Sequence, residues 1–484
     1  MRARTSGRAD AAEALDAADA APHVGALPAG PLRSIADVAG VTVGHATLDA
    51  RGVQTGVSVV RPHAGDVYRD KVPAAAAVIN GFGKSIGLVQ VDELGVLETP
   101  LALTNTFGVG ALAQAQIRAA IDANPQIGRA WPSVNPLVFE CNDGYLNDLH
   151  AFAVTPAHYA QALADARRAF ARGAVGAGRG MSCFDLKGGI GSASRVVRAA
   201  GEAWTVGALV LANFGRLPML TIAGVPVGRM IAERDAGGAP GAGGGQGADG
   251  ARDDVAAAGA RGERGARGER GERGARGERG ERGERGERGE RGERGERGER
   301  GERGDGPHGT YGTYGTYGAH GRENAGTGGG AAGGLAPRRA RDAGASSPGA
   351  APDAAPPEQG SIIMLVATDA PLSSRQLKRV ALRAAAGLAR TGSVYGHGSG
   401  DIALAFSTAY TVPHDAERVS LPALVADAAL DPLFAAAADS VEQAIVDALW
   451  RATRVTGRDG HTRRALRDAA PELERWLRAA RAGA

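Results

Sequence analysis

A run of glycines at every third position divides this chain and limits what it can fold into. Fifteen consecutive glycines follow this spacing from Gly262 to Gly304, and Gly-Glu-Arg is the dominant triplet. The surrounding stretch 235–358 holds 38 of the 75 glycines in the chain. A segment of this composition has too little apolar surface to form a core. The compact fold must therefore come from the sequence on either side of it.

The glycine period is that of a collagen triple helix, but the run contains no proline to pre-set the polyproline backbone. We therefore expect 235–358 to be a solvated, disordered insert, with collagen-like trimerisation as the alternative. Residues 1–30 are rich in alanine and alternate it with charged residues, which predicts a disordered lead. The expected folded domain then has two parts, 31–234 and 361–484, and the second ends in a polar, Arg-rich tail.

Charge and cysteine content exclude several classes of protein. The 56 Lys and Arg residues nearly balance the 53 Asp and Glu residues, for a net charge of +3, which disfavours nucleic acid as a partner. The apolar runs are much shorter than the roughly 18 residues of a membrane helix. The first thirty residues contain no continuous apolar block, so we expect no secretory signal. Cys141 and Cys183 form no CxxC pair. We expect a cytoplasmic protein without membrane partners.

Short apolar runs between turn formers alternate with segments of helical spacing, which predicts an α/β or α+β fold. Ser361 opens a strand of eight residues, and Ser373 or Ser374 is placed to cap the helix that follows and ends at Gly392. Further strands are predicted at 204–213, 219–227 and 402–406, and further helices at 107–122, 156–172, 420–429 and 441–453.

Generic chemical motifs are absent: the sequence has no HExxH, no EF-hand loop and no complete phosphate loop, so no metal or cofactor is indicated. Five strings instead embed polar residues in glycine-rich or apolar sequence. They are ECNDGYLND (140–148), GAGRGMSCFDLKGGIGSASRVV (176–197), ANFG (212–215), GSIIMLVATDAP (360–371) and GHGSGDIALAFSTA (396–409). Each alone is typical of a turn between strands.

Together and in this order, the five strings resemble the L-aminopeptidase/D-esterases and β-peptidyl aminopeptidases, a family of self-processing serine peptidases. The resemblance runs over 34–227 and resumes over 360–410, with the insert just before the self-cleavage point of the family. It implies a four-layer αββα sandwich similar to that of the N-terminal-nucleophile hydrolases. It also implies an enzyme that releases N-terminal amino acids from short peptides, amides or esters, and that assembles as a homo-oligomer of four or more chains.

The resemblance places self-cleavage at the Gly360–Ser361 bond and makes Ser361 the nucleophile. Glycine at position 360 has no Cβ and so permits a backbone that a hydroxyl can attack. Cleavage would free the α-amine of Ser361, and an α-amine with an ordinary pKa of about 7.7–8.0 is a suitable general base near neutrality. One residue then supplies both nucleophile and base.

The resemblance gives four further residues a catalytic role. Ser399 would orient the Ser361 proton, and Asp401 would fix Ser399 and hold the charge of the amine. Many family members have Glu in place of Asp401, so the shorter side chain is a departure. Asn213 would donate to the oxyanion of the tetrahedral intermediate. Tyr145 would be the second polar group near the reacting carbonyl.

For the substrate, the resemblance suggests Glu140 as the anchor of the free amino group, with Gly188 and Gly189 lining the cleft by their backbone. Lys187 and Arg195 are as compatible with structural ion pairs as with ligand contacts. Lys84 stands where the family commonly has an acidic residue, so specificity is expected to differ.

Two other functions fit parts of the sequence. The self-processing ornithine acetyltransferases use a similar scheme for acyl transfer, but with threonine as the nucleophile, and position 361 is serine. An inactive structural or oligomeric relative, driven by the collagen-like tract, would instead lose its assembly when the tract is deleted. The five strings favour the peptidase over both.

Overall fold

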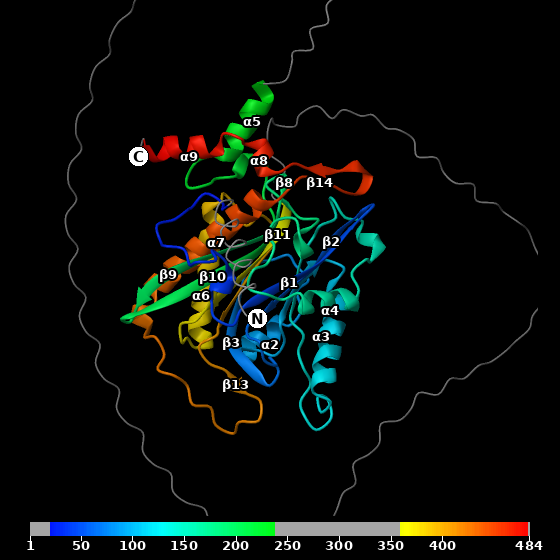
Figure 1. Cartoon of the computed structure of the whole chain (residues 1–484), viewed down its shortest axis with the longest axis vertical. Coiled ribbons are helices and arrows are strands. Elements are labelled where there is room, and N and C mark those ends of the chain that lie inside the picture. Colours follow the sequence, from blue (N-terminus) through cyan, green and yellow to red (C-terminus); the bar gives the residue numbers. More distant parts are fainter. Residues whose placement is uncertain (1–19, 238–358, 483–484) are drawn as a thin grey trace, which may run out of the picture. The chain divides into compact units, whose positions relative to one another are not determined.

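The computed structural model describes residues 20–237 and 359–482, in which two β-sheets lie face to face with helices on both outer sides (Figure 1). The predicted disorder of residues 1–19 and of the insert falls outside the described residues, except for the first three residues of the insert, 235–237. The smaller sheet has the strand order β1-β2-β5-β6. Its strands are β1 (Thr42–Ala50), β2 (Val53–Arg61), β5 (Leu101–Asn105) and β6 (Val138–Cys141).

The larger sheet has seven strands in the order β13-β3-β12-β11-β10-β9, with β4 paired to β3. Its strands are β3 (Asp70–Gly81), β4 (Val96–Leu97), β9 (Gly189–Ala199), β10 (Glu202–Asn213), β11 (Gln359–Thr368), β12 (Gly398–Ser407) and β13 (Val412–Pro413). Two small hairpins pair β7 (Ser182–Cys183) with β8 (Leu186–Lys187) and β14 (Val455–Thr456) with β15 (Thr462–Arg463). Sequence before and after the insert thus forms one sheet.

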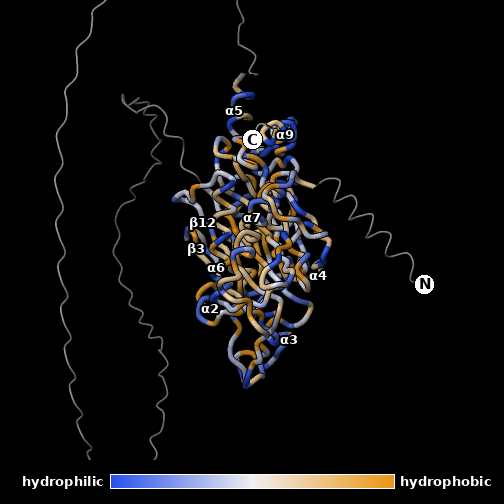
Figure 2. The backbone as a smooth tube through the Cα atoms, turned by 90° about the vertical axis from the view of Figure 1, so that its left-hand side faces the viewer, coloured by the Kyte–Doolittle hydropathy of each residue, from blue (hydrophilic) through white to orange (hydrophobic). Residues whose placement is uncertain are grey.

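Helices cover the outer face of each sheet. Contacts join α6 and α7 to the larger sheet, and α3 and α4 to the smaller one. The helices are α2 (Leu88–Leu94), α3 (Val109–Ala123), α4 (Pro156–Ala164), α5 (Val227–Gly237), α6 (Ser374–Arg390), α7 (Asp431–Arg451), α8 (Leu466–Ala469) and α9 (Leu473–Ala482). In Figure 2 hydrophobic stretches gather around α7, in the middle of this part of the chain.

Three apolar layers hold the four structural layers together, which confirms the predicted αββα sandwich. The layer between the sheets includes Val60, Leu103, Leu211 and Ile363; the layers under the helices include Met364 with Val441, and Val59 with Leu112. Alternate residues of β11 enter two different layers, Ile362 and Met364 toward the helices and Ile363 and Leu365 toward the other sheet. A strand buried on both faces needs an unbroken apolar run, which is why 361–367 contains no charged residue.

The path from β11 through α6 to β12 places the two strands side by side and parallel. Ser373 caps α6, and its side chain and that of Gln376 complete a capping box. The helix ends before Gly392, which has a φ of +103° and packs against the Met219 carbonyl, where a Cβ would lie 1.9 Å from the oxygen. Glycine is therefore required at this stop.

Four local expectations are wrong or incomplete. Residues 20–30 belong to the described structure: Val24 is buried, and its N–H donates to Gln443. The helix expected over 156–172 ends at Ala164, because the Asp165 carboxylate accepts from the His45 N–H and the Arg167 backbone pairs with Val43. The range 420–429 contains Pro422 and has only a short 3-10 turn at Asp427–Ala429. The strand expected over 219–227 is a turn with a single bridge between Ile222 and Val225.

No helix in residues 20–237 and 359–482 combines the length and apolarity needed to cross a membrane.

Candidate active site

Ser361 lies near the start of β11, between the strands that carry its expected partners. Its pairing partners are Asn213 on β10 and Gly400 on β12. The Gly400 N–H donates to Ser361 Oγ at 3.2 Å. Both Ser361 and Gly360 line a cavity of about 510 Å³. The predicted nucleophile is thus at the wall of an open site and already holds one hydrogen bond.

The residue before the nucleophile has a backbone that requires glycine. Gly360 has a φ of +126°, a conformation that residues with side chains rarely adopt. A Cβ at this position would lie 2.0 Å from the Asn213 carbonyl oxygen and 2.9 Å from Phe214 Cα. A side chain at position 360 would be strained at this φ and would clash with the backbone of residues 213 and 214. Only glycine therefore fits directly before Ser361.

Ser399 and Asp401 form a buried pair next to the nucleophile. The Ser399 hydroxyl donates to Asp401 Oδ1 at 2.6 Å, and both residues are 0% exposed. The register places them opposite Gly360 and Ile362, so their side chains share a sheet face with Ile362 and not with Ser361. They flank the backbone of residue 361. This placement suits an interaction with the nitrogen of Ser361 better than one with its hydroxyl.

Asn213 reaches the cavity from the end of β10. Its Oδ1 accepts the Ser182 N–H at 2.8 Å, and its Nδ2 donates to the Asn142 carbonyl at 2.9 Å. These two contacts fix which end of the amide is the donor. An amide nitrogen carries two N–H groups, so one remains for a ligand oxygen in the cavity.

Tyr145 lines the same cavity and is 39% exposed. Its ring stacks on His461 with centroids 4.7 Å apart and an interplanar angle of 12°. The Arg463 guanidinium also contacts the Tyr145 ring, with its central carbon 3.7 Å from the ring centroid. The tyrosine is therefore held as part of the cavity wall.

Glu140 is a buried carboxylate with neutral partners at the cavity. Its Oε2 accepts from the Thr106 hydroxyl at 2.6 Å and its Oε1 from the backbone N–H of Lys84 at 2.8 Å. It forms no ion pair with any of the described residues. A Cβ added to Gly83 would lie 3.5 Å from Glu140 Oε1 and 3.9 Å from Gly400 Cα, so the carboxylate lies close to the β12 side of Ser361. A buried charge without a counter-charge suits the binding of a cation.

Gly188 and Gly189 are not brought into the cavity. A Cβ on Gly188 would lie 2.3 Å from the Ala212 carbonyl, and one on Gly189 would lie 2.1 Å from that of Gly173. Both glycines thus serve close backbone packing. Lys187 is fully buried and donates to three backbone carbonyls, and burial sets the pKa of its amine well below the ordinary value. Arg195 likewise donates to backbone carbonyls and to Gln443, so both are structural.

The structure adds residues that sequence reasoning missed. Asn80 donates to the carbonyls of Gly396 and Ser399 and so holds the turn that precedes Gly400. The sequence did hold a signal for Asn80, because this residue opens the turn-forming string NGFGK (80–84), which ends at Lys84. Ser182, Asp185, Arg216 and Arg463 also line the cavity. Arg216 directly follows the ANFG string, whereas Arg463 is remote in sequence and carries no local signal.

The two facing sheets between helices, with a serine and its preceding glycine at the cavity, define a hydrolase of the N-terminal-nucleophile type. The model of peptidase family S58 matches residues 33–463, and the chain belongs to this family. The β-peptidyl aminopeptidase BapA of Sphingosinicella microcystinivorans is 32% identical over 446 residues, which cover 90% of this chain and 85% of the relative.

Two solved structures have the same fold. A β-aminopeptidase from a Burkholderia species is 30% identical with a TM-score of 0.64, over 94% of this chain and 96% of that one. The L-aminopeptidase D-Ala-esterase/amidase of Ochrobactrum anthropi is 27% identical with a TM-score of 0.64, over 95% and 98%. The latter is described as a prototype serine aminopeptidase and a variant of the Ntn hydrolase fold. The likeness confirms the predicted fold class and favours the aminopeptidase over the acyltransferase.

Proposed function

We propose that this chain cuts itself at Gly360–Ser361 and then works as a serine aminopeptidase with Ser361 as nucleophile. The observation that carries the proposal is the geometry of the Gly360–Ser361 bond. It has a glycine that admits no side chain, a serine hydroxyl in contact with the Gly400 N–H, and an open cavity beside both.

The self-cleavage step is an acyl shift followed by hydrolysis. Ser361 Oγ attacks the carbonyl carbon of Gly360, the C–N bond breaks, and the nitrogen takes up the hydroxyl proton. Gly360 is then held as an ester on Ser361 Oγ. Water hydrolyses this ester, which leaves a carboxylate on Gly360 and both a free hydroxyl and a free α-amine on Ser361. The buried pair of Ser399 and Asp401 lies beside this new amine and would hold its charge.

In turnover, Ser361 Oγ attacks the substrate carbonyl while the α-amine of the same residue takes up its proton. Asn213 Nδ2 would donate to the oxyanion, a contribution whose loss typically costs about 10²–10³ in rate. Tyr145 would be the second polar group at the carbonyl. The proton then goes to the leaving amine or alcohol, and water releases the acid from the acyl-enzyme.

The substrates in this proposal are short peptides, amides or esters with a free amino group. Glu140 supports this choice, since its buried carboxylate has neutral partners and would bind an ammonium group. We extend the proposal to a homo-oligomer and to a cytoplasmic location. The compartment is supported by Cys141 and Cys183, which are buried and form no disulfide among the described residues.

Intact mass spectrometry under denaturing conditions tests the proposal, with wild type, Ser361→Ala and the matched control Ser407→Ala. Ser407 lies on the same strand as Ser399 but bonds to the Ala370 carbonyl. Two chains in wild type and control, one beginning at Ser361, and a single full-length chain in Ser361→Ala support it. A single uncut wild-type chain contradicts it. Processed protein should then hydrolyse aminoacyl amides and leave their N-acetylated forms intact.

A further inference from the structure

The charged residues of the cavity separate onto two sides of the nucleophile. Glu140 lies toward β12, close to Gly400. Arg216 follows the end of β10, on the opposite side of β11, and Arg463 joins it there through Ser182. The Arg463 Nε donates to Ser182 Oγ at 3.1 Å, and the Ser182 N–H donates to Asn213 Oδ1. Since β11 lies between β10 and β12, Ser361 stands between a carboxylate and a pair of guanidiniums.

The two guanidiniums of Arg216 and Arg463 are only partly neutralised by nearby carboxylates. Arg216 Nη1 and Arg463 Nη2 share one oxygen, Asp185 Oδ1, at 3.3 Å and 3.6 Å. The other oxygen of Asp185 accepts the Leu217 N–H at 3.0 Å. Two positive charges thus share one carboxylate, and the surplus charge is only partly exposed, with side-chain exposures of 31% for Arg216 and 18% for Arg463.

A donor of this pair also lacks a partner. The Nε of Arg216 is buried and has no hydrogen-bond acceptor among the described residues. A buried guanidinium N–H without an acceptor is costly, and a bound carboxylate would relieve that cost with a charge-assisted bond. Arg463 is held in place by the Tyr145 ring and Ser182, so it is ready for a ligand without further ordering.

We propose that Arg216 and Arg463 form a subsite for the carboxylate of the leaving residue, so that the preferred substrates are dipeptides with a free C-terminus. This inference rests on the proposed aminopeptidase function and names its substrate class. The ammonium group of the dipeptide binds Glu140, its amide carbonyl lies at Ser361, and its carboxylate binds the two guanidiniums. Amides and esters without that carboxylate use the same nucleophile without the subsite.

The test compares X-Gly with X-Gly-NH₂, where X is whichever of L-alanyl, D-alanyl and β-alanyl is turned over. Enzymes are wild type, Arg216→Gln, Arg463→Gln, the double variant, Asp185→Asn and the control Arg198→Gln, whose side chain is exposed and bonds to the Gly201 carbonyl. Rates are normalised to the processed chain that begins at Ser361. The ratio of kcat/KM for acid over amide is the readout, because the intrinsic difference between the leaving amines cancels between variants.

The double variant should lose roughly 10- to 100-fold in kcat/KM on X-Gly, as expected for a charge-assisted contact, and change less than threefold on X-Gly-NH₂. Asp185→Asn should raise the acid-over-amide ratio, because it removes the carboxylate that competes for the pair. Asparagine tolerates the φ of +58° at this position. Arg198→Gln should leave the ratio unchanged.

An equal loss on acid and amide would show that the two arginines only support the cavity wall, and would overturn the subsite while leaving the aminopeptidase intact. The Gly360 carboxylate released by self-cleavage is another carboxylate in this cavity. Variants that slow processing but keep the acid-over-amide ratio would assign the pair to Gly360 and overturn the substrate class. Processed wild type that cleaves neither compound contradicts the proposed function itself.

Discussion

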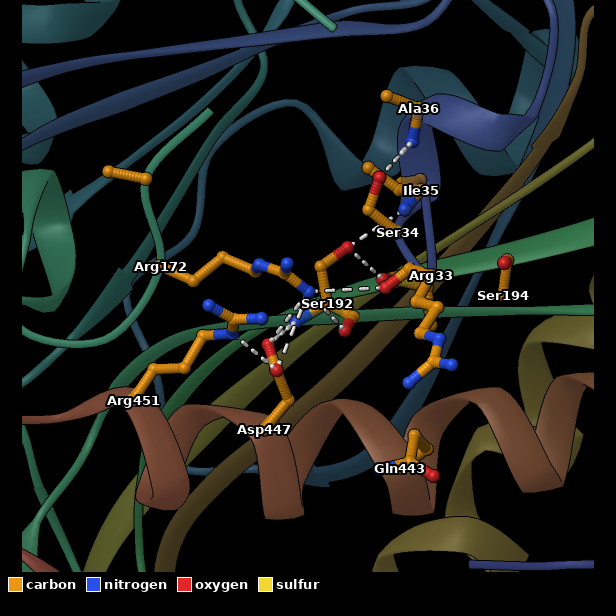
Figure 3. A network of polar contacts seen from close by, with 12 residues as sticks. Arg33, Ser34, Ile35, Ala36, Arg172, Ser192, Ser194, Gln443, Asp447 and Arg451 are labelled. Carbon is orange, nitrogen blue, oxygen red and sulfur yellow. Dashed lines mark hydrogen bonds and ion pairs between the residues drawn. The ribbon is translucent and has the colours of Figure 1, made fainter. Parts of the chain in front are cut away.

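Asp401 on β12 and Asp447 on α7 are both buried carboxylates, but they have different hydrogen-bond partners. The partners of Asp447 indicate a structural role, and those of Asp401 indicate a role in the reaction. Asp447 accepts from Arg451 Nε at 2.9 Å, from Arg172 Nη1 at 3.4 Å and from the Ser192 N–H at 3.0 Å (Figure 3). Asp401 accepts from the neutral Ser399 hydroxyl beside the backbone of Ser361. The charge of Asp447 is already balanced by two guanidiniums. The charge of Asp401 is instead placed to balance the ammonium group that self-cleavage would create on Ser361.

The Asp447 network also joins the two parts of the chain that self-cleavage would separate. Arg172 and Ser192 precede the insert, while Asp447 and Arg451 follow it. Burial raises the pKa of the Asp447 carboxyl, and Arg172 and Arg451 act against this rise. Together with the pairing of β10 and β11, this network would keep the two chains associated after cleavage.

The comparison predicts its largest effect at Asp401→Asn. Asparagine keeps an oxygen to accept the Ser399 hydroxyl but removes the charge that would hold the α-amine of Ser361. We expect kcat/KM on an aminoacyl amide to fall by about 10²-fold or more, within the usual range for an acid–base group, with the melting temperature nearly unchanged. Activity should be measured per processed chain. Activity within threefold of wild type would remove Asp401 from the mechanism.

The opposite pattern is expected at Asp447→Asn. Loss of this charge leaves Arg172 and Arg451 buried beside a neutral group, so the free energy of unfolding should fall by about 3–5 kcal/mol. Denaturation of the processed protein measures the change, while kcat/KM of the folded fraction should stay close to wild type. The matched control is Asp427→Asn, an exposed aspartate paired with Arg375, for which a much smaller change is expected because water screens the pair. A catalytic loss without a stability loss would contradict the assignment.

Local sequence was sufficient for much of this molecule. The apolar run after Ser361, the Ser373 cap and the stop at Gly392 depend on neighbouring residues, and they placed β11, α6 and β12 correctly. Contacts between segments that are distant in the sequence could not be predicted from local patterns. The 165–172 stretch has helical spacing, but its pairing with Val43 outweighs that propensity. The burial of Val24 depends on Gln443, and the face on which Ser399 lies depends on strand register.

The same limit applies to the site. Glu140 and Tyr145 belong to one recognisable string and do share the cavity with Ser361. Arg463 enters that cavity from a hairpin about a hundred residues after the nucleophile, in a segment with no recognisable motif. Gly188 and Gly189 belong to an equally recognisable string, yet they pack against backbone. A glycine-rich string therefore predicts that something packs closely against its backbone. It does not predict whether that neighbour is a ligand or another part of the chain.

A third buried aspartate, Asp143, extends the comparison to the pH dependence of folding stability. It is 1% exposed, its Oδ1 accepts from Asn147 Nδ2 at 3.0 Å, and burial raises its pKa to about 7. A carboxyl with a raised folded-state pKa favours the fold while it is protonated. Below about pH 4 both folded and unfolded chains hold the proton; between about pH 4 and 7 only the folded chain does, so this contribution to stability falls across that range and is gone above about pH 7.

Asp143→Asn should therefore flatten the decline of stability between about pH 4 and 7 and raise the free energy of unfolding at pH 8 by about 1–2 kcal/mol. This is less than the full pKa shift because the surroundings relax around an ionised carboxylate. Asparagine keeps the oxygen that Asn147 contacts. Melting temperatures across pH 4–9 measure the effect, with the exposed Asp122→Asn as the control. Parallel curves for wild type and Asp143→Asn would show that the buried amine of Lys187, which interacts electrostatically with Asp143, compensates this carboxylate as Arg172 and Arg451 compensate Asp447.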